Sequence, residues 1–96
     1  MNTDDLLTKL RDLKPQLTAS YKAKEIGLFG SFVRGEQDID SDIDVLVELE
    51  EGADLFDLMG LALYLEERLE RKVDVVSKRA LRPELRGAIL REVIAV

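Results

Sequence analysis

The first apolar residues of the chain recur every three or four positions, which is the spacing of one helix face. They are Leu6, Leu7, Leu10, Leu13 and Leu17. This pattern predicts a helix over residues 4–18, with Thr3 as its N-cap. Pro15 lies late in this segment and predicts an end or a kink there, because proline cannot donate the helical hydrogen bond.

Three shorter apolar segments have the length and the β-branched content of strands. They cover residues 25–29, 42–49 and 72–76. The second segment alternates apolar and polar side chains, and a polar loop over residues 37–41 precedes it. The sequence therefore predicts a small sheet whose strands are separated by other elements.

Helical patterns lie between and after these strands. A short helix is predicted over residues 31–37, and the longest helix over residues 54–70. Pro83 suits the first turn of a last helix. Helices that interleave with a few strands predict an α/β (α+β) fold, in which helices pack on the sheet. We expect one domain over residues 1–96.

Composition narrows the class of protein. Hydrophobic residues make up 46% of the 96 residues and charged residues 35%, which is typical of a globular domain. This length supports one core, so a second domain for gripping a substrate would have to come from another chain. No apolar run approaches the roughly 18 residues of a membrane span, and a cytoplasmic location is expected.

Charge and residue types limit the partners and the metals. The formal net charge of −6 argues against tightly held DNA or RNA, because such binding relies on Lys and Arg at phosphates. Cysteine and histidine are both absent. Any metal must then be held by oxygen ligands, which favours Mg²⁺, Mn²⁺ or Ca²⁺.

Carboxylates open the second predicted strand and interrupt the third. Asp42 and Asp44 flank Ile43, so they point to the same face about 7 Å apart and can converge on cations. Asp74 would add a third carboxylate if its strand neighbours theirs. The alternative interpretation is that all three are solvated strand residues.

Gly30 and Ser31 stand where a predicted strand meets a predicted helix. Glycine lets a phosphate approach the backbone, and the N–H groups of a helix start bind anionic oxygens. Arg34 lies on the same helix face and can reach a β- or γ-phosphate. The alternatives are an ordinary N-cap serine, and a surface arginine near Glu36 or Asp38.

Together these elements resemble a known superfamily. Gly30-Ser31, ten residues, Asp42-x-Asp44 and a strand aspartate thirty residues later resemble the nucleotidyltransferases typified by DNA polymerase beta. Within that superfamily the chain is similar to the minimal nucleotidyltransferases (MNT), the partners in HEPN/MNT toxin–antitoxin pairs. The resemblance extends from about residue 20 to the end of the chain.

The resemblance implies a nucleotidyltransferase palm, a short mixed sheet flanked by helices. Asp42, Asp44 and Asp74 match the metal-binding acids, which would hold two Mg²⁺ ions. Gly30 and Ser31 match the pair that binds the triphosphate of ATP. The implied function is an antitoxin that transfers AMP from ATP to a tyrosine hydroxyl of a HEPN toxin and so neutralises it.

Three other functions remain open from the sequence. The first is an antitoxin that acts by binding alone, although the intact set of three acids counts against it. The second is a nucleotidyltransferase for a small molecule such as an aminoglycoside, although such enzymes usually carry an added domain. The third is a small acidic α/β domain whose acids are incidental.

Overall fold

A four-stranded mixed sheet forms the centre of the computed structural model, which describes residues 1–96. Its strands are β1 (Ala23–Phe29), β2 (Ile43–Leu49), β3 (Val73–Ser77) and β4 (Ile94–Ala95). The strand order is β3-β2-β1-β4. The β2–β3 pair is parallel, whereas β1 pairs antiparallel with both β2 and β4. The predicted short mixed sheet is therefore confirmed, with β4 as an additional strand.

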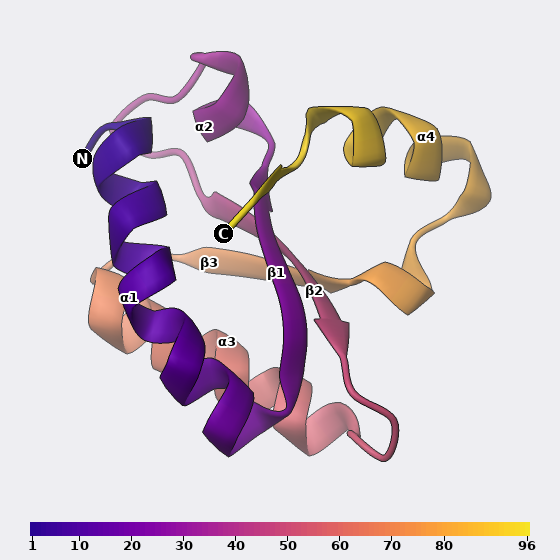
Figure 1. Cartoon of the computed structure of the whole chain (residues 1–96). Coiled ribbons are helices and arrows are strands. Elements are labelled where there is room, and N and C mark those ends of the chain that lie inside the picture. The colour runs from indigo at the N-terminus through magenta and orange to yellow at the C-terminus, as the bar shows by residue number, and fades with distance from the viewer.

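The helices are unevenly distributed around the sheet. They are α1 (Thr3–Tyr21), α2 (Ser31–Arg34), α3 (Leu55–Leu69) and α4 (Pro83–Glu92), with a short 3₁₀ turn, η1 (Lys78–Ala80). Figure 1 shows α1 and α3 side by side, with α4 standing apart from them across the strands. The two long helices thus cover one sheet face and leave the other to α4.

Alternation along β2 divides the sheet into an apolar face and an open face. Ile43, Val45 and Val47 are fully buried, while Asp44 between them is half-buried. The buried side chains pack against leucines of the two long helices, Leu6, Leu7, Leu10, Leu17, Leu61, Leu65 and Leu69. Apolar burial of this kind is the main stabilising term of a small domain, and it leaves the polar strand positions on the opposite face.

The start of α1 differs from the prediction. Its N-cap is Asn2, whose side chain accepts a hydrogen bond of 2.8 Å from the Asp5 N–H. The Thr3 hydroxyl instead donates to the Phe32 carbonyl at 2.6 Å, so the N-cap assignment of Thr3 is wrong. Pro15 does not end the helix, which continues to Tyr21. Pro15 and Arg11 are exposed, so water can satisfy the carbonyl that proline leaves free.

The bounds of α2 and β2, which lie beside the candidate site residues, also differ from those predicted. Helix α2 ends at Arg34, because Gly35 adopts a left-handed conformation with φ 72° and closes it. Strand β2 begins at Ile43, so Asp42 lies just before the strand. No helix is long and apolar enough to cross a membrane.

Candidate active site

Asp44 and Asp74 lie side by side on the open face of the sheet. They are direct partners in the parallel ladder of β2 and β3. Directly paired residues of neighbouring strands point to the same face, and such strands are about 4.8 Å apart. Their neighbours Val45 and Val73 point into the core. The sequence expectation that these two carboxylates share a face is therefore met.

The charge on Asp44 is poorly compensated. Its pKa is raised, first by partial burial and then by the negative charges of Asp74 and Asp42. The Arg34 guanidinium opposes the shift but does not reverse it. A carboxylate whose pKa is raised by neighbouring acids is typical of a functional site, where a cation or a proton relieves the repulsion.

Asp42 stands at the end of an exposed loop that is tied to the body of the protein. Arg71 donates hydrogen bonds of 3.0–3.3 Å to the carbonyls of Asp38, Ile39 and Ser41. Its guanidinium also lies 5.3 Å from the Phe32 ring centroid. Arg71 therefore fixes the loop that precedes Asp42.

Gly30 packs directly against Asp44. It has φ 83°, a conformation that favours glycine, and any side chain there would overlap the Asp44 carboxyl group. Gly30 is therefore the residue type that lets the end of β1 approach the acids. Its N–H donates a 2.7 Å hydrogen bond to Glu92 Oε2 at the end of α4.

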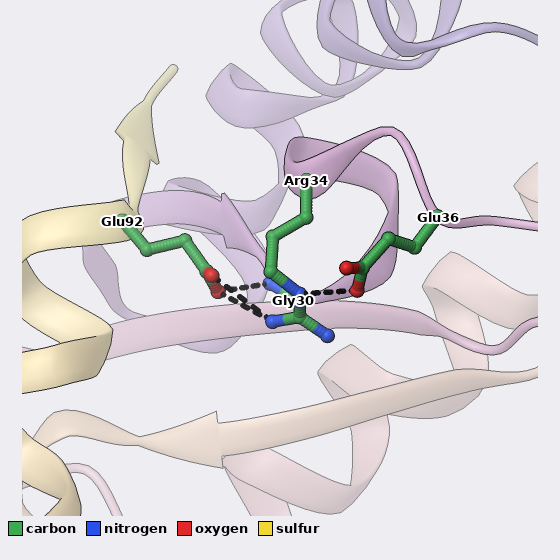
Figure 2. A network of polar contacts seen from close by, with 4 residues as sticks. All are labelled: Gly30, Arg34, Glu36 and Glu92. Carbon is green, nitrogen blue, oxygen red and sulfur yellow. Dashed lines mark hydrogen bonds and ion pairs between the residues drawn. The ribbon is translucent and has the colours of Figure 1, made fainter.

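Arg34 is held between two carboxylates. Its Nε is 2.7 Å from Glu36 Oε1, and its Nη1 is 3.0 Å from Glu92 Oε1. Figure 2 shows Glu92 reaching both Arg34 and the Gly30 backbone. The two ion pairs raise the pKa of Arg34, which keeps its positive charge. The pKa of Glu92 is lowered by the Gly30 N–H and by Arg34.

A pocket of about 460 Å³ joins these groups. It is lined by Phe29, Gly30, Arg34, Asp44, Asp74, Val76, Ala80, Leu81, Arg82, Leu85, Ala88, Ile89 and Glu92. The sheet supplies the acids on one side, and α4 supplies an apolar wall on the other. Its volume lies within the range of small-ligand pockets. Two of the predicted site residues do not line this pocket, Ser31 and Asp42. Ser31 begins α2 and is half-buried.

Sequence reasoning missed the part that α4 plays. Glu92 is 62 positions from Gly30, and no local pattern links two such distant residues. One signal was available, because an acid in the last turn of a helix opposes the helix dipole. Glu92 occupies that position in α4, so a tertiary partner outside the helix could have been expected.

The acids fit a hard divalent cation without forming a cage for it. No three acidic side chains lie close enough together to make a ready-made metal cluster. Mg²⁺ usually takes one or two carboxylates and completes its shell with waters and substrate phosphates. The paired Asp44 and Asp74, with Asp42 nearby, provide oxygen ligands of that kind.

The sheet, the paired aspartates and the adjoining Gly30 turn agree with the resemblance to the nucleotidyltransferases found in the sequence. A profile of the nucleotidyltransferase domain family matches residues 6–96. The chain therefore belongs to this family, and its mixed sheet flanked by helices has the nucleotidyltransferase fold.

The most similar relatives that we describe belong to one part of this family, the minimal nucleotidyltransferases and protein adenylyltransferases. The chain is 43% identical over 83 residues to protein adenylyltransferase MntA of Thermococcus cleftensis, covering 86% of this chain and 84% of that protein. A solved structure assigned as a minimal nucleotidyltransferase has a TM-score of 0.85 and 43% identity, over 100% of this chain and 97% of that one. The MNT antitoxin in complex with a tri-AMPylated HEPN toxin of Shewanella oneidensis has a TM-score of 0.60 and 26% identity. This match covers 98% of this chain and 67% of that one.

Proposed function

We propose that this chain is a Mg²⁺-dependent protein adenylyltransferase, and that it acts as an antitoxin. It transfers AMP from ATP to a tyrosine hydroxyl of a HEPN-type toxin and thereby neutralises the toxin. The observation that carries the proposal is the pairing of Asp44 with Asp74 directly beside the Gly30 turn, in one pocket. The MntA relative and the AMPylated toxin complex support the choice of a protein acceptor.

In this proposal, one group of site residues binds the cations and another group binds the phosphates. Asp42, Asp44 and Asp74 would hold two Mg²⁺ ions, which supply Lewis-acid stabilisation of charge on the phosphate oxygens. The backbone and hydroxyl of Gly30-Ser31 would bind the β- and γ-phosphates, since the first N–H groups of a helix lack partners within it. Arg34 adds a positive charge beside Gly30 and can bind phosphate oxygens through two N–H groups.

The reaction is a displacement at the α-phosphorus. The tyrosine oxygen forms a new bond to phosphorus, and the bond from the α-phosphorus to the bridging α,β-oxygen breaks. Pyrophosphate leaves with that electron pair, and the tyrosine proton passes to solvent. The pocket groups contribute by holding the triphosphate in line with the attacking oxygen.

Helix α3 offers a surface for the toxin partner. Four large apolar side chains lie within one arc of this helix and remain exposed, Leu55, Phe56, Met59 and Leu63. Exposed apolar groups gathered in this way are typical of protein interfaces. Acidic residues Glu50, Glu51 and Asp54 stand at the start of this surface, so a basic rim on the toxin would complement it.

The proposed function is tested by incubating the protein with labelled ATP, Mg²⁺ and the HEPN protein encoded beside it. Intact-mass analysis should show a toxin that gains AMP groups, and peptide mapping should place them on tyrosine. The Asp42→Asn and Asp44→Asn variants should leave the toxin unmodified. Toxin inhibition without any gain in mass would show that the chain acts by binding alone.

A further inference from the structure

Glu92 binds the two groups that the proposed function assigns to phosphate. Its carboxylate accepts a hydrogen bond from the Gly30 N–H at 2.7 Å, and it accepts two from Arg34 Nη1 at 3.0 and 3.2 Å (Figure 2). These donors are the backbone group and the guanidinium assigned above to the triphosphate. A carboxylate and a phosphate are both anions that bind N–H and guanidinium donors. The two therefore compete for the same donors.

The contact between Glu92 and Gly30 is not explained by the stability of helix α4. Glu92 is the last residue of α4, where the helix dipole disfavours a negative charge. Arg34 already has a second carboxylate partner, Glu36, which makes no bond to Gly30. Glu92 is thus the side chain that joins the phosphate-binding turn to the wall of the pocket.

Apart from this contact, helix α4 is anchored mainly by the segment that follows it, where the Val96 N–H also donates to the Ile26 carbonyl at 3.0 Å. The helix itself contains no buried residue. The segment that follows it pairs with β1 through two positions, Ala95 with Gly27 and Ile94 with Leu28. Leu85, Ala88 and Ile89 of α4 form the apolar wall of the pocket. The bond from the Gly30 N–H to Glu92 therefore ties this apolar wall to the phosphate-binding turn.

We propose that Glu92 is a phosphate mimic that lowers the affinity of the site for triphosphates, and that the nucleotide must displace its carboxylate. Its carboxylate holds the Gly30 and Arg34 donors at the edge of the pocket. A ligand enters productively when its β- and γ-phosphates replace that carboxylate. A ligand without β- and γ-phosphates leaves the Glu92 contacts in place, so Glu92 lowers the affinity for triphosphates and does not affect the affinity for monophosphates. This inference rests on the proposed nucleotide site and adds a residue to it.

The test measures binding of α,β-methylene-ATP with Mg²⁺, an analogue that cannot transfer AMP. Glu92→Gln keeps the shape of the side chain but removes its charge. We expect this variant to bind the analogue about three- to tenfold more tightly than the unaltered protein. AMP lacks the β- and γ-phosphates, so its affinity should not change. Glu36→Gln is the matched control, because Glu36 also contacts Arg34. The affinity of this variant for the analogue should stay within about twofold of that of the unaltered protein.

The outcomes separate this inference from the proposed function. Equal or weaker binding of the analogue by Glu92→Gln, when the unaltered protein binds it, would overturn the role of Glu92 alone. No binding by any variant would overturn the nucleotide site and this inference together. A second measurement uses the unaltered protein, so its outcome does not depend on whether a variant folds. In the unaltered protein, the Gly30 amide resonance and the Glu92 carboxyl carbon should both shift on saturation with the analogue, and should stay in place with AMP.

Discussion

Asp44 carries its charge in an unfavourable place. Partial burial and the neighbouring Asp74 and Asp42 raise its pKa, so the folded protein binds a proton there more tightly than the unfolded chain does. Stability is therefore lost as the pH rises from the unfolded pKa through the folded pKa, and the full penalty is present above the folded pKa. Such a penalty is expected at a site arranged to bind a cation.

The Asp44→Asn variant should separate stability from activity. Without Mg²⁺ at pH 7 its melting temperature should exceed that of the unaltered protein by a few degrees, because the repelling charge is gone. The gain should shrink as the pH is lowered and the aspartate becomes protonated. AMP transfer should fall about 100-fold or more. Thermal melts between pH 4 and pH 8 and a transfer assay check this, and a lower melting temperature at pH 7 would contradict the charge argument.

Gly30 allows a close approach that a side chain would prevent. Gly30→Ala should lower the free energy of unfolding by about 2–4 kcal/mol, because the new methyl group overlaps the Asp44 carboxyl and the backbone has φ 83°. Gly35 is a matched control, since it has φ 72° but open space around it. Gly35→Ala should lose only about 1 kcal/mol. Denaturant melts of both variants test this, and equal losses would show that backbone strain alone matters at Gly30.

At the scale of elements, the polar loop before β2 depends on one arginine from the turn between α3 and β3. Arg71 joins the turn before β3 to the loop carbonyls of Asp38, Ile39 and Ser41. Asp42 follows this loop, and the N–H of Ile43 bonds to the Lys72 carbonyl at 3.0 Å. The loop and the start of β3 therefore form one unit, so Arg71 positions Asp42 without itself entering the pocket.

Arg71→Met should weaken this unit. We expect a loss of about 1–2 kcal/mol in the free energy of unfolding, because several carbonyls lose a charged donor. AMP transfer should also fall, with a larger effect on the apparent affinity for Mg²⁺ than on nucleotide affinity without metal. Arg11→Met on the exposed side of α1 is the control and should change neither. Unchanged Mg²⁺ dependence in Arg71→Met would mean that the loop holds its shape without this residue.

At the scale of the whole molecule, the proposed function uses two separate surfaces. The pocket lies on the open face of the sheet beneath α4, whereas the exposed apolar residues of α3 belong to a helix that covers the opposite face. Nucleotide binding and toxin binding should therefore be separable by mutation.

Phe56 and Leu63 on α3 test this separation. Their side chains are 81% and 65% exposed, so replacing both by serine should not disturb the core. The double variant should bind α,β-methylene-ATP normally and lose most of its affinity for the toxin, because buried aromatic and aliphatic groups dominate interface energies. Calorimetry with each ligand measures both. Normal toxin binding by the double variant would place the interface elsewhere.

The sequence by itself determined the elements and the chemistry that each could carry. Period-two alternation in β2 placed Asp44 opposite the buried Ile43 and Val45, and an intact strand allows no other arrangement. The nucleotidyltransferase motif and the helical leucines are likewise local patterns. The motif indicated the correct family, and the spacing of the leucines indicated helices beside the sheet.

Only the tertiary structure decided how distant segments meet. Strand register placed Asp74 directly beside Asp44. The return of α4 brought Glu92 to the Gly30 N–H, and the turn after α3 brought Arg71 to the loop before Asp42. These contacts join segments 30 or more positions apart, where the outcome depends on the packing of the whole chain. Local propensity and periodicity contain no information about such pairings, because they act within one element.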